Sequence, residues 1–447
     1  MNPDAPVRLG LLGFGTVGQG VARLLVEAAE DVRRRAGRPI EVARIVVRDA
    51  ARARGACDAL GLDPELVGTD ADALLADPSV DIALELVGGE RPALDWTRAA
   101  FEAGKHVVSA NKALVALHGE TLFAAAHAAG VAYRFEAAVA GGIPVLKALE
   151  EGLAANRIDW LAGIINGTGN FILSEMAHRA RGFDEALRDA QALGYAEADP
   201  TFDVEGVDAA HKLAILASLA FDAPLAFDAV HVEGISSLDA ADVGFAAELG
   251  YRVKHLGIAR RRAAAGAGGE AGLELRVHPA LVPASRLLAS VDGVNNAVVV
   301  HGDAVGATLY YGPGAGAGPT GSAVVADVID LVRGAGGDAV RTRDPAAPAP
   351  LPPERFRSPF YLRIEAVDRP GVLAHVAGIF GEADISIEAI LQKEPAEVPE
   401  GGAEPTVPII LLTREVREGL LREAVRRVQA LDSVTGNVVV IRVETLD

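Results

Sequence analysis

A short stretch in the middle of the chain concentrates carboxylates around one lysine. Its charged residues are Glu197, Asp199, Asp203, Glu205, Asp208 and Lys212. Asp208 and Lys212 lie four residues apart on a helical pattern, so their side chains share one face of the predicted helix. That spacing is also typical of an ordinary salt bridge on a protein surface. The density of carboxylates in a turn-prone loop instead favours a site for a substrate ammonium group, where a lysine near a carboxylate can exchange a proton with a reacting hydroxyl.

Lysine is rare in this sequence, which makes the positions of the remaining lysines informative. Only six of the 42 basic residues are lysine. Because a guanidinium stays charged, lysine is expected to persist where an ammonium must titrate or fit a compact site. Lys112 follows a predicted strand, residues 107–109, at the carboxyl edge of a parallel sheet, where doubly wound folds bind their ligands. We therefore predict a functional role for Lys112.

A glycine-rich turn near the N-terminus indicates a dinucleotide site. The motif is Gly13, Phe14, Gly15, Thr16, Val17 and Gly18. It directly follows a predicted buried strand, residues 7–12, and opens an amphipathic helix, which is the context that gives this short pattern its meaning. The first glycine permits the turn, the second lets the backbone approach a pyrophosphate, and the third allows close packing of helix and strand. The alternative is a glycine turn that binds nothing.

The end of the second predicted strand bears on the choice of cofactor. An acidic residue at this position accepts a hydrogen bond from the 2′-hydroxyl of NAD, whereas an arginine accommodates the 2′-phosphate of NADP. Here the strand ends in Arg48, with Arg52 or Arg54 nearby, which favours NADP and leaves NAD possible. Because Asp49 is adjacent, the alternative is a solvated arginine beside an adenosine site that accepts both cofactors.

Strands that alternate with helices define the elements that must position these residues. Apolar runs at 7–12, 42–47, 82–87 and 107–109, with helical patterns between them, predict a Rossmann-type, doubly wound parallel sheet. We assign residues 1–135 to this α/β dinucleotide-binding domain, completed by a helix within 311–340. The glycine-rich segment before that helix adds Gly314 to the candidate cofactor residues. Residues 136–310 form a second α/β domain, for substrate binding, catalysis and dimerisation, with strands near 160–165, 230–235, 273–278 and 297–301 and a solvent loop at 262–272.

The chain starts again after an Ala-Pro-rich linker, residues 345–357. Residues 358–447 read as strand, helix, strand, strand, helix, strand, which is a ferredoxin-like βαββαβ unit. A polar insertion at 397–405 is expected to be a mobile loop.

Composition excludes several other classes of protein. The formal net charge of −19 opposes binding to nucleic acids and to anionic membranes, because no basic patch offsets it. No apolar stretch approaches the length of a membrane span. Cys57 is the only cysteine, so no intramolecular disulfide can form, and we expect a cytoplasmic protein. The histidines include no His-x-x-x-His pair, which argues against a transition-metal enzyme.

The motifs together resemble the homoserine dehydrogenase family. They are the turn at 13–18, Ala-Asn-Lys-Ala-Leu at 110–114, Glu136 followed by Gly-Gly-Ile-Pro at 141–144, Asn-Gly-Thr at 166–168, Gly-Tyr-Ala-Glu-Ala-Asp-Pro at 194–200, and Asp208 with Lys212. The resemblance covers residues 5–340. After the linker, Asp-Arg-Pro-Gly-Val-Leu at 368–373 resembles an ACT domain, a small unit that senses amino acids.

The resemblance implies NAD(P)-dependent interconversion of L-homoserine and L-aspartate 4-semialdehyde, in threonine, methionine and isoleucine biosynthesis. It makes Lys212 the principal proton-transfer group, with Asp208 orienting it and Lys112 between nicotinamide and substrate. It places Glu197 on the substrate amino group, and Asp203 of the same loop is a further substrate-binding candidate. It also implies a site for Na⁺ or K⁺ at Glu136 and the carbonyls of Val139, Gly141 and Ile143. The alternatives are another NADP-dependent oxidoreductase of an amino-acid aldehyde or keto acid, and a sensor without catalytic activity.

The ACT-like unit is expected to regulate the enzyme. Threonine is the expected effector, held near Asp368, Gly371, Ile385 and Ser386, and the chain is expected to form a homodimer or homotetramer. The alternative is a dimerisation unit that binds no ligand. If the unit is an independent module, a chain ending near Ala347 should keep catalysis and lose threonine sensitivity.

Overall fold

The computed structural model describes residues 5–263, 271–334, 347–392 and 404–446. The chain divides into two compact units, each built from several segments. Unit 1 comprises residues 1–167, 207–230 and 294–348, and unit 2 comprises residues 168–206, 231–293 and 349–447. The predicted segment 136–310 thus contributes to both units. Most of the predicted loop at 262–272 and of the insertion at 397–405 lies outside the described residues, whereas only residues 345 and 346 of the predicted linker do. The described linker lies against β10, where the Leu273 N–H donates to the Ala349 carbonyl and the Leu351 N–H to the Leu273 carbonyl, both at 2.8 Å.

Unit 1 contains the predicted parallel sheet. Its six strands run in the order β3-β2-β1-β4-β5-β6, and every pairing is parallel. The doubly wound fold is therefore confirmed. The strands are β1 (Val7–Leu12), β2 (Ile40–Val46), β3 (Val67–Gly68), β4 (Ile82–Glu85), β5 (His106–Ser109) and β6 (Tyr133–Arg134).

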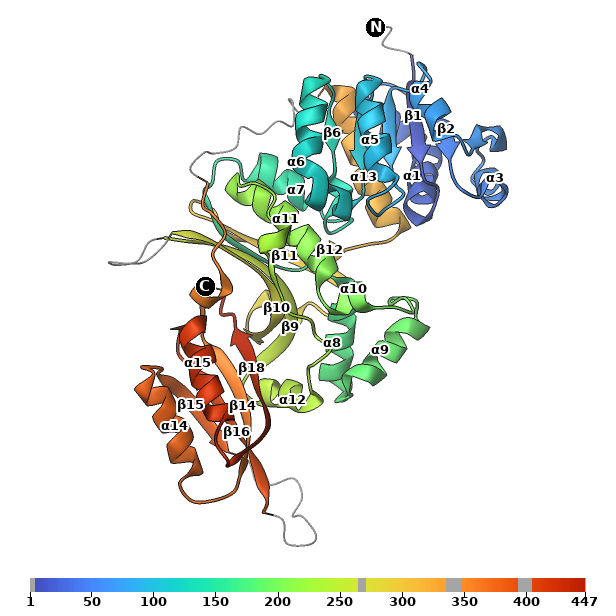
Figure 1. Ribbon diagram of the computed structural model, residues 1–447. Coiled ribbons are helices and arrows are strands. Elements are labelled where there is room, and N and C mark those ends of the chain that lie inside the picture. The colour runs from blue at the N-terminus through green and yellow to red at the C-terminus, as the bar shows by residue number, and fades with distance from the viewer. Residues whose placement is uncertain (1–4, 264–270, 335–346, 393–403, 447) are drawn as a thin grey trace. The chain divides into compact units, whose positions relative to one another are not determined.

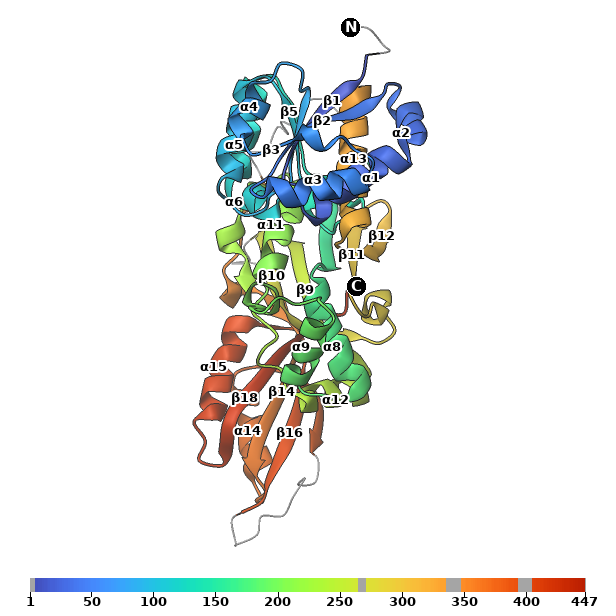
Figure 2. The ribbon, with the colours of Figure 1, turned by 90° about the vertical axis from the view of Figure 1, so that its right-hand side faces the viewer.

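Helices cover both faces of this sheet, and Figure 2 shows α1, α2 and α13 on one side and α4, α5 and α6 on the other. Helix α13 comes from far along the chain, yet it packs on α1 so closely that a Cβ atom at Gly20 would lie 1.9 Å from the carbonyl oxygen of Ala317. The late helix thus completes the dinucleotide-binding fold. The helices are α1 (Thr16–Glu27), α2 (Ala29–Ala36), α3 (Ala50–Ala59), α4 (Ala71–Ala76), α5 (Ala93–Glu102), α6 (Lys112–Ala128) and α13 (Ala317–Arg333).

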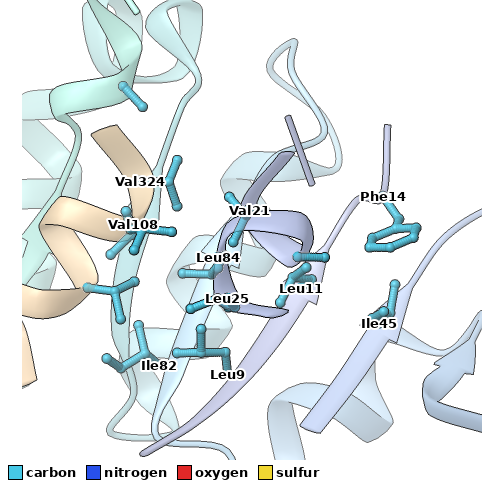
Figure 3. Packing of buried hydrophobic residues seen from close by; sticks show 14 of the residues in the cluster. Leu9, Leu11, Phe14, Val21, Leu25, Ile45, Ile82, Leu84, Val108 and Val324 are labelled. Atoms are coloured by element: carbon cyan, nitrogen blue, oxygen red, sulfur yellow. The ribbon is translucent and has the colours of Figure 1, made fainter. Parts of the chain in front are cut away.

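Aliphatic side chains from the strands and from α1 and α13 form the core of the sheet (Figure 3). Leu9, Leu11 and Leu84 are fully buried, as are Val21 on α1 and Val324 on α13. Burying such side chains contributes about 1.5–3 kcal/mol each. The core therefore fixes the carboxyl edge of the sheet, where the glycine-rich turn and Lys112 begin their helices.

The remainder of unit 1 is a short antiparallel sheet with two helices. Strand β11 pairs with β7 on one side and with β12 on the other. No strand was predicted at β12, although its side chains alternate between half-buried and exposed. The elements are α7 (Val145–Lys147), β7 (Ile158–Ile164), α11 (Val207–Phe221), β11 (Asn295–Gly302) and β12 (Gly306–Pro313).

Unit 2 joins a long hairpin to the C-terminal sheet. Strands β9 and β10 pair antiparallel, and β10 also pairs parallel with β8 and with the last strand, β18. The predicted strand at 230–235 is reduced to the two residues of β8. The elements before residue 349 are α8 (Gly167–Arg179), α9 (Phe183–Ala192), α10 (Thr201–Val204), β8 (His231–Val232), α12 (Ala240–Glu248), β9 (Tyr251–Arg262) and β10 (Gly272–Pro283).

The C-terminal sheet runs β18-β14-β16-β15, which is the predicted ferredoxin-like order. Figure 1 shows α14 and α15 on one side of it and α12 on the other. Both faces are apolar: Leu362 and Leu411 face α14 and α15, whereas Tyr361 and Ile410 join a cluster with α8, α9 and α12. The elements are β13 (Arg357–Ser358), β14 (Phe360–Val367), α14 (Val372–Glu382), β15 (Ile387–Gln392), β16 (Thr406–Thr413), β17 (Val416–Arg417), α15 (Glu418–Gln429) and β18 (Val434–Val443).

Among the described residues, no helix is both long and apolar enough to span a membrane.

Candidate functional site

The glycine-rich turn has the geometry that a bound pyrophosphate requires. Gly13 has a φ of +105°, a conformation that side chains disfavour, and its N–H donates to the Val46 carbonyl at 2.9 Å. A Cβ at Gly18 would lie 2.6 Å from the Gly13 carbonyl oxygen, so helix and turn pack closely. A Cβ at Gly15 would meet no atom within 4 Å. The open space in front of Gly15, at the N-terminus of α1, is therefore where an anion fits.

A cleft of about 1240 Å³ extends from this turn along the ends of β1, β2 and β4. Gly13, Phe14, Gly15, Thr16 and Arg48 line it as predicted, whereas Val17, Gly18 and Gly314 do not. Val17 and Gly18 lie within α1. Gly314 instead packs on Asn296, whose amide would lie within 2.4 Å of a Cβ at that glycine. The role of these three residues in cofactor binding stays a prediction.

The cleft carries two arginines that the sequence did not single out, Arg23 and Arg91, beside two that it did. Arg48 and Arg52 line it, but Arg54 turns away and donates to the Val67 carbonyl. Asp49 caps α3 by accepting the Arg52 N–H at 3.1 Å, which gives this carboxylate a structural role. The lining residues that sequence reasoning missed include Gln19, Arg23, Thr69, Arg91 and Trp96, which come from three separate segments.

Lys112, Asp208 and Lys212 meet in unit 1. Lys112 is the first residue of α6, and Asp208 and Lys212 lie one turn apart on α11. The ammonium of Lys112 is 2.6 Å from Asp208 Oδ1, and that of Lys212 is 2.7 Å from Asp208 Oδ2. The Asp208 side chain is only 3% exposed, against 34% for Lys112. Asp208 and Lys212 therefore form a buried ion pair rather than a surface salt bridge, and Lys112 shares the same carboxylate.

The charge of Asp208 is fixed by its two neighbours. Burial alone would raise the pKa of this carboxyl, but the ammonium groups of Lys212 and Lys112 hold the pKa well below its usual range. Asp208 stays ionised and holds both ammonium groups by charge-assisted hydrogen bonds.

Two further groups orient this cluster. Asn166 donates from Nδ2 to Asp208 Oδ2 at 2.8 Å, and Lys212 donates to the carbonyl of Ile165 at 2.7 Å. Sequence reasoning gave these residues no role, although Asn166 begins one of the family motifs. Behind Lys112, Asn111 caps α6, while its side chain donates to the Gly89 carbonyl. The position of Lys112 is therefore set by the helix start and not by its ion pair alone.

The other predicted substrate residues lie in unit 2. Glu197 is exposed in the segment between α9 and α10, and Asp203 is half-buried on α10. The Thr168 hydroxyl donates to the Tyr195 carbonyl at 2.7 Å, which ties the Asn-Gly-Thr motif to the segment that carries Glu197.

The predicted cation loop has an unusual backbone. Ala140 and Gly141 both have left-handed conformations, with φ of 53° and 47°. Among the described residues, no N–H donates to the carbonyls of Val139 or Gly141, whereas those of Glu136 and Ile143 accept backbone hydrogen bonds. The Glu136 carboxylate accepts the N–H groups of Leu146 and Lys147. The described part of the chain contains no cluster of three His, Cys, Asp or Glu side chains suited to a metal ion.

A smaller cavity of about 350 Å³ lies at the turn between β14 and α14. Asp368 and Gly371 line it as predicted. Ile385 and Ser386 do not: Ile385 is buried in the core beneath α14, and the Ser386 carbonyl accepts the Arg414 N–H. The structure thus divides the predicted effector residues into two that line this cavity and two that support the fold.

Comparison with known proteins identifies the family. Over 99% of its length the chain is 54% identical to a homoserine dehydrogenase of Pseudomonas aeruginosa, all of which is covered. The chain belongs to the homoserine dehydrogenase family. Residues 144–329 match the family model of homoserine dehydrogenase, residues 13–136 match the homoserine dehydrogenase NAD-binding domain, and residues 360–432 match the ACT domain. The chain is thus an oxidoreductase with a nucleotide-binding domain and a C-terminal ACT domain.

Solved structures of homoserine dehydrogenases have the same fold. A homoserine dehydrogenase from Thiobacillus denitrificans superposes with a TM-score of 0.90 at 50% identity, over 99% of each chain. A hyperthermophilic archaeal homoserine dehydrogenase, solved in complex with NADPH, has a TM-score of 0.60 at 25% identity and matches 73% of this chain and 97% of its own.

Proposed function

We propose that the chain interconverts L-homoserine and L-aspartate 4-semialdehyde, with NADP as its preferred cofactor and with Lys212 as the group that moves the proton. The observation that carries this proposal is the shared carboxylate of Asp208, which holds two lysines at the carboxyl edge of the parallel sheet. The nicotinamide, when bound, accepts or donates the hydride. The chain's own residues must then bind the substrate, orient it and handle the proton.

Lys212 is suited to both directions of proton transfer. In alcohol oxidation the neutral amine accepts the hydroxyl proton, and in aldehyde reduction the ammonium returns it to the carbonyl oxygen. Asp208 and the Ile165 carbonyl orient the Lys212 nitrogen at 2.7 Å each. Lys112 shares the same carboxylate and takes a place between cofactor and substrate. Glu197 and Asp203 supply the negative charge for the substrate ammonium group.

The arginines of the cleft support NADP. Arg48 and Arg52 line the cleft beside the end of β2, and Asp49 at the same edge is engaged in capping α3. A guanidinium at this position provides the charge and the paired donors that a 2′-phosphate needs. NAD remains a second cofactor.

The loop at 136–143 is proposed as a site for Na⁺ or K⁺. Carbonyl oxygens are suitable ligands for such ions. The left-handed turn at Ala140 and Gly141 and the carbonyls of Val139 and Gly141 support the assignment, together with Glu136 and Ile143.

The ACT domain is proposed to bind threonine at Asp368 and Gly371, and the enzyme to be a cytoplasmic homodimer or homotetramer. The cavity at the turn before α14 supports the first assignment. Cys57, the only cysteine, is a buried free thiol, which is typical of a reducing compartment. A dimerisation domain without a ligand is the competing assignment.

Initial rates test these proposals together. Rates are measured with homoserine and other hydroxy-amino acids, with NADP and NAD, at varied Na⁺ and K⁺, and with and without threonine. We expect the highest kcat/KM with homoserine and NADP, and inhibition by threonine. Faster turnover of another substrate would contradict the substrate assignment. Rates unaffected by millimolar threonine, together with no binding by calorimetry, would contradict the effector.

A further inference from the structure

The last strand of the ACT domain lies against the long hairpin within unit 2. Strand β18 pairs parallel with β10, with Arg442 opposite Ala280 and Val443 opposite Leu281. The Glu444 N–H donates to the Leu281 carbonyl at 2.9 Å. The ACT sheet is thus continuous with β10, which also pairs with β8.

Arg442 connects two carboxylates across this junction. Its Nη1 and Nη2 lie 2.7 and 3.0 Å from the two oxygens of Glu233, which follows β8. Its Nε and Nη2 lie 3.0 and 2.6 Å from the two oxygens of Glu418, at the start of α15. Both contacts are bidentate, and the Arg442 side chain is 4% exposed. Such buried, planar pairs fix the position of both partners.

Glu233 begins a segment that is bound to the end of the substrate loop. Its own N–H donates to the Val277 carbonyl, and its carbonyl accepts from His255 at 3.0 Å. The next residue, Gly234, packs so closely that a Cβ there would lie 2.8 Å from the Cα of Glu205.

Two hydrogen bonds continue this contact. The Ile235 N–H donates to the Val204 carbonyl at 2.9 Å, and the Ser236 hydroxyl donates to the Glu205 carboxylate at 2.6 Å. Glu205 lies three residues before Asp208 in the sequence. The segment 233–236 therefore holds the chain directly before the catalytic helix.

We propose that Arg442 of the ACT domain is a positioning residue for the substrate loop 197–206, which it holds in place through Glu233 and the segment 233–236. This inference rests on the proposed function, because that function assigns Glu197 and Asp203 of this loop to the substrate. Weakening the Arg442–Glu233 contact should loosen the loop and impair homoserine binding. The proton-transfer cluster should change little, because its hydrogen bonds lie within unit 1.

The test compares Glu233→Gln with a matched control, Asp242→Asn, in the full chain. Asp242 on α12 also receives a bidentate arginine from the ACT sheet, Arg363, at 2.7 and 3.0 Å, and it is fully buried, whereas the Glu233 side chain is 32% exposed. The control therefore breaks an equivalent ACT contact that does not involve the segment 233–236.

We expect Glu233→Gln to raise the KM for homoserine about tenfold, which is the effect of losing about 1.4 kcal/mol of binding. The kcat and the Kd for NADPH should stay within about twofold, and amide hydrogen exchange in residues 197–206 should accelerate. Asp242→Asn should leave the KM and that exchange unchanged at a comparable loss of Tm. Ser236 is exposed, and Ser236→Ala removes its hydrogen bond to the Glu205 carboxylate. This variant should raise the KM and accelerate exchange in residues 197–206, both by less than Glu233→Gln does.

Several results would overturn the inference. Equal changes in KM and in exchange for Glu233→Gln and Asp242→Asn would show that the Arg442–Glu233 contact only stabilises the fold. Unchanged exchange in 197–206 would show that the segment does not hold the loop. If Glu233→Gln fails to fold, Ser236→Ala decides the outcome by the same two readouts. A wild-type chain that does not oxidise homoserine contradicts the proposed function, whereas the exchange measurement still tests the contact.

Discussion

Two carboxylates in this protein are each shared by two cations, yet their surroundings suit different tasks. Asp208 in unit 1 lies between Lys112 and Lys212, and Glu418 in unit 2 lies between Arg422 and Arg442. Both carboxylates are nearly inaccessible. An ammonium can release its proton within a suitable pH range, whereas a guanidinium stays charged. The lysine version of the arrangement can therefore do proton chemistry, and the arginine version can only hold elements together.

Two of the three other described lysines show a second use of the ammonium, whereas the third, Lys147, pairs with the carboxylates of Asp327 and Asp330. Lys105 donates to the carbonyls of Asp77 and Val80, and Lys254 donates to the carbonyl of Val291 and to Asp292. A compact group with three donors fits such closely spaced acceptors better than a planar guanidinium. The scarcity of lysine thus indicates compact sites in general, of which the Asp208 cluster is one.

The largest effect is expected from exchanging the cation in unit 1. Lys212→Arg keeps a positive charge near Asp208 but removes the group that can release and regain a proton, because a guanidinium stays protonated. We expect kcat to fall by about two to four orders of magnitude, which is the usual range for a general acid or base. The kcat of Lys212→Ala should fall by a similar factor. Steady-state rates and NADPH fluorescence titrations measure the loss and the retained cofactor binding.

Arg422→Lys is the matched exchange in unit 2. Arg422 is half exposed on α15 and contacts Glu418 and Glu233. We expect kcat to remain near the wild-type value. If both exchanges had equal effects on kcat, the division between a reactive and a structural cluster would be wrong.

The second prediction tests the stability that the arginine cluster provides. Arg276 is fully buried, 2.9 Å from Glu444 and 3.2 Å from Glu274. Glu444→Gln leaves its charge undercompensated, so the free energy of unfolding should fall by about 3 kcal/mol. Urea unfolding measures this change, and kcat per folded molecule should be preserved.

A shortened chain tests whether unit 2 is stable without the whole ACT sheet. Ending the chain at Ala347 removes Arg442 and Glu444 together with Tyr361 and Ile410, and it uncovers the apolar side chains of α8, α9 and α12 that pack with them. The structure therefore replaces the expectation that such a chain keeps catalysis: it should unfold or aggregate. A soluble, fully active shortened chain would show that unit 2 does not need the ACT sheet.

The third prediction concerns pH and places the acid sensitivity of folding in unit 2. Burial lowers the pKa of His255 to about 4. Because this pKa lies below its unfolded value of about 6.5, the neutral ring stabilises the fold above pH 6.5, and that stability is lost as the pH falls through 4. Between pH 6.5 and 4, the free energy of unfolding of His255→Gln should therefore fall by about 2 kcal/mol less than that of the wild-type chain.

Unfolding curves at several pH values measure this slope. His375→Gln, on the exposed face of α14, is the control and should keep the wild-type slope. An unchanged slope in His255→Gln would assign the acid sensitivity to other groups.

Local patterns predicted the parts of the fold that depend on nearby residues. The strand at 7–12 matches β1, and the Asp208–Lys212 spacing led to a real contact, because strand alternation and helical periodicity are local properties. The gathering of Arg23, Arg91 and Trp96 at one cleft could not be predicted, because it depends on how distant segments pack. Asn166 likewise reaches Asp208 from 42 residues away.

The independence of the ACT domain was the least accurate interpretation of the sequence. Pro-rich linkers commonly separate modules, and the βαββαβ order was correct. A signal of the second interface was nevertheless present in β16, where Val407 to Leu412 is almost continuously apolar. A strand with one face in solvent alternates, whereas a strand buried on both faces does not.

The smallest effect is expected for an arginine that has neither a buried partner nor a structural role. Arg48 is exposed at the rim of the cofactor cleft, in contrast to Arg276 and Arg442. If it contacts the 2′-phosphate, Arg48→Ala should weaken NADPH binding about tenfold, the value of about 1.4 kcal/mol expected for one charge-assisted contact. NADH binding and the Tm should stay near the wild-type values. Arg54→Ala is the control, because Arg54 bonds to the Val67 carbonyl outside the cleft. Equal losses of NADPH and NADH affinity in Arg48→Ala would show that the residue does not distinguish the two cofactors, and a loss of Tm would place Arg48 among the structural arginines.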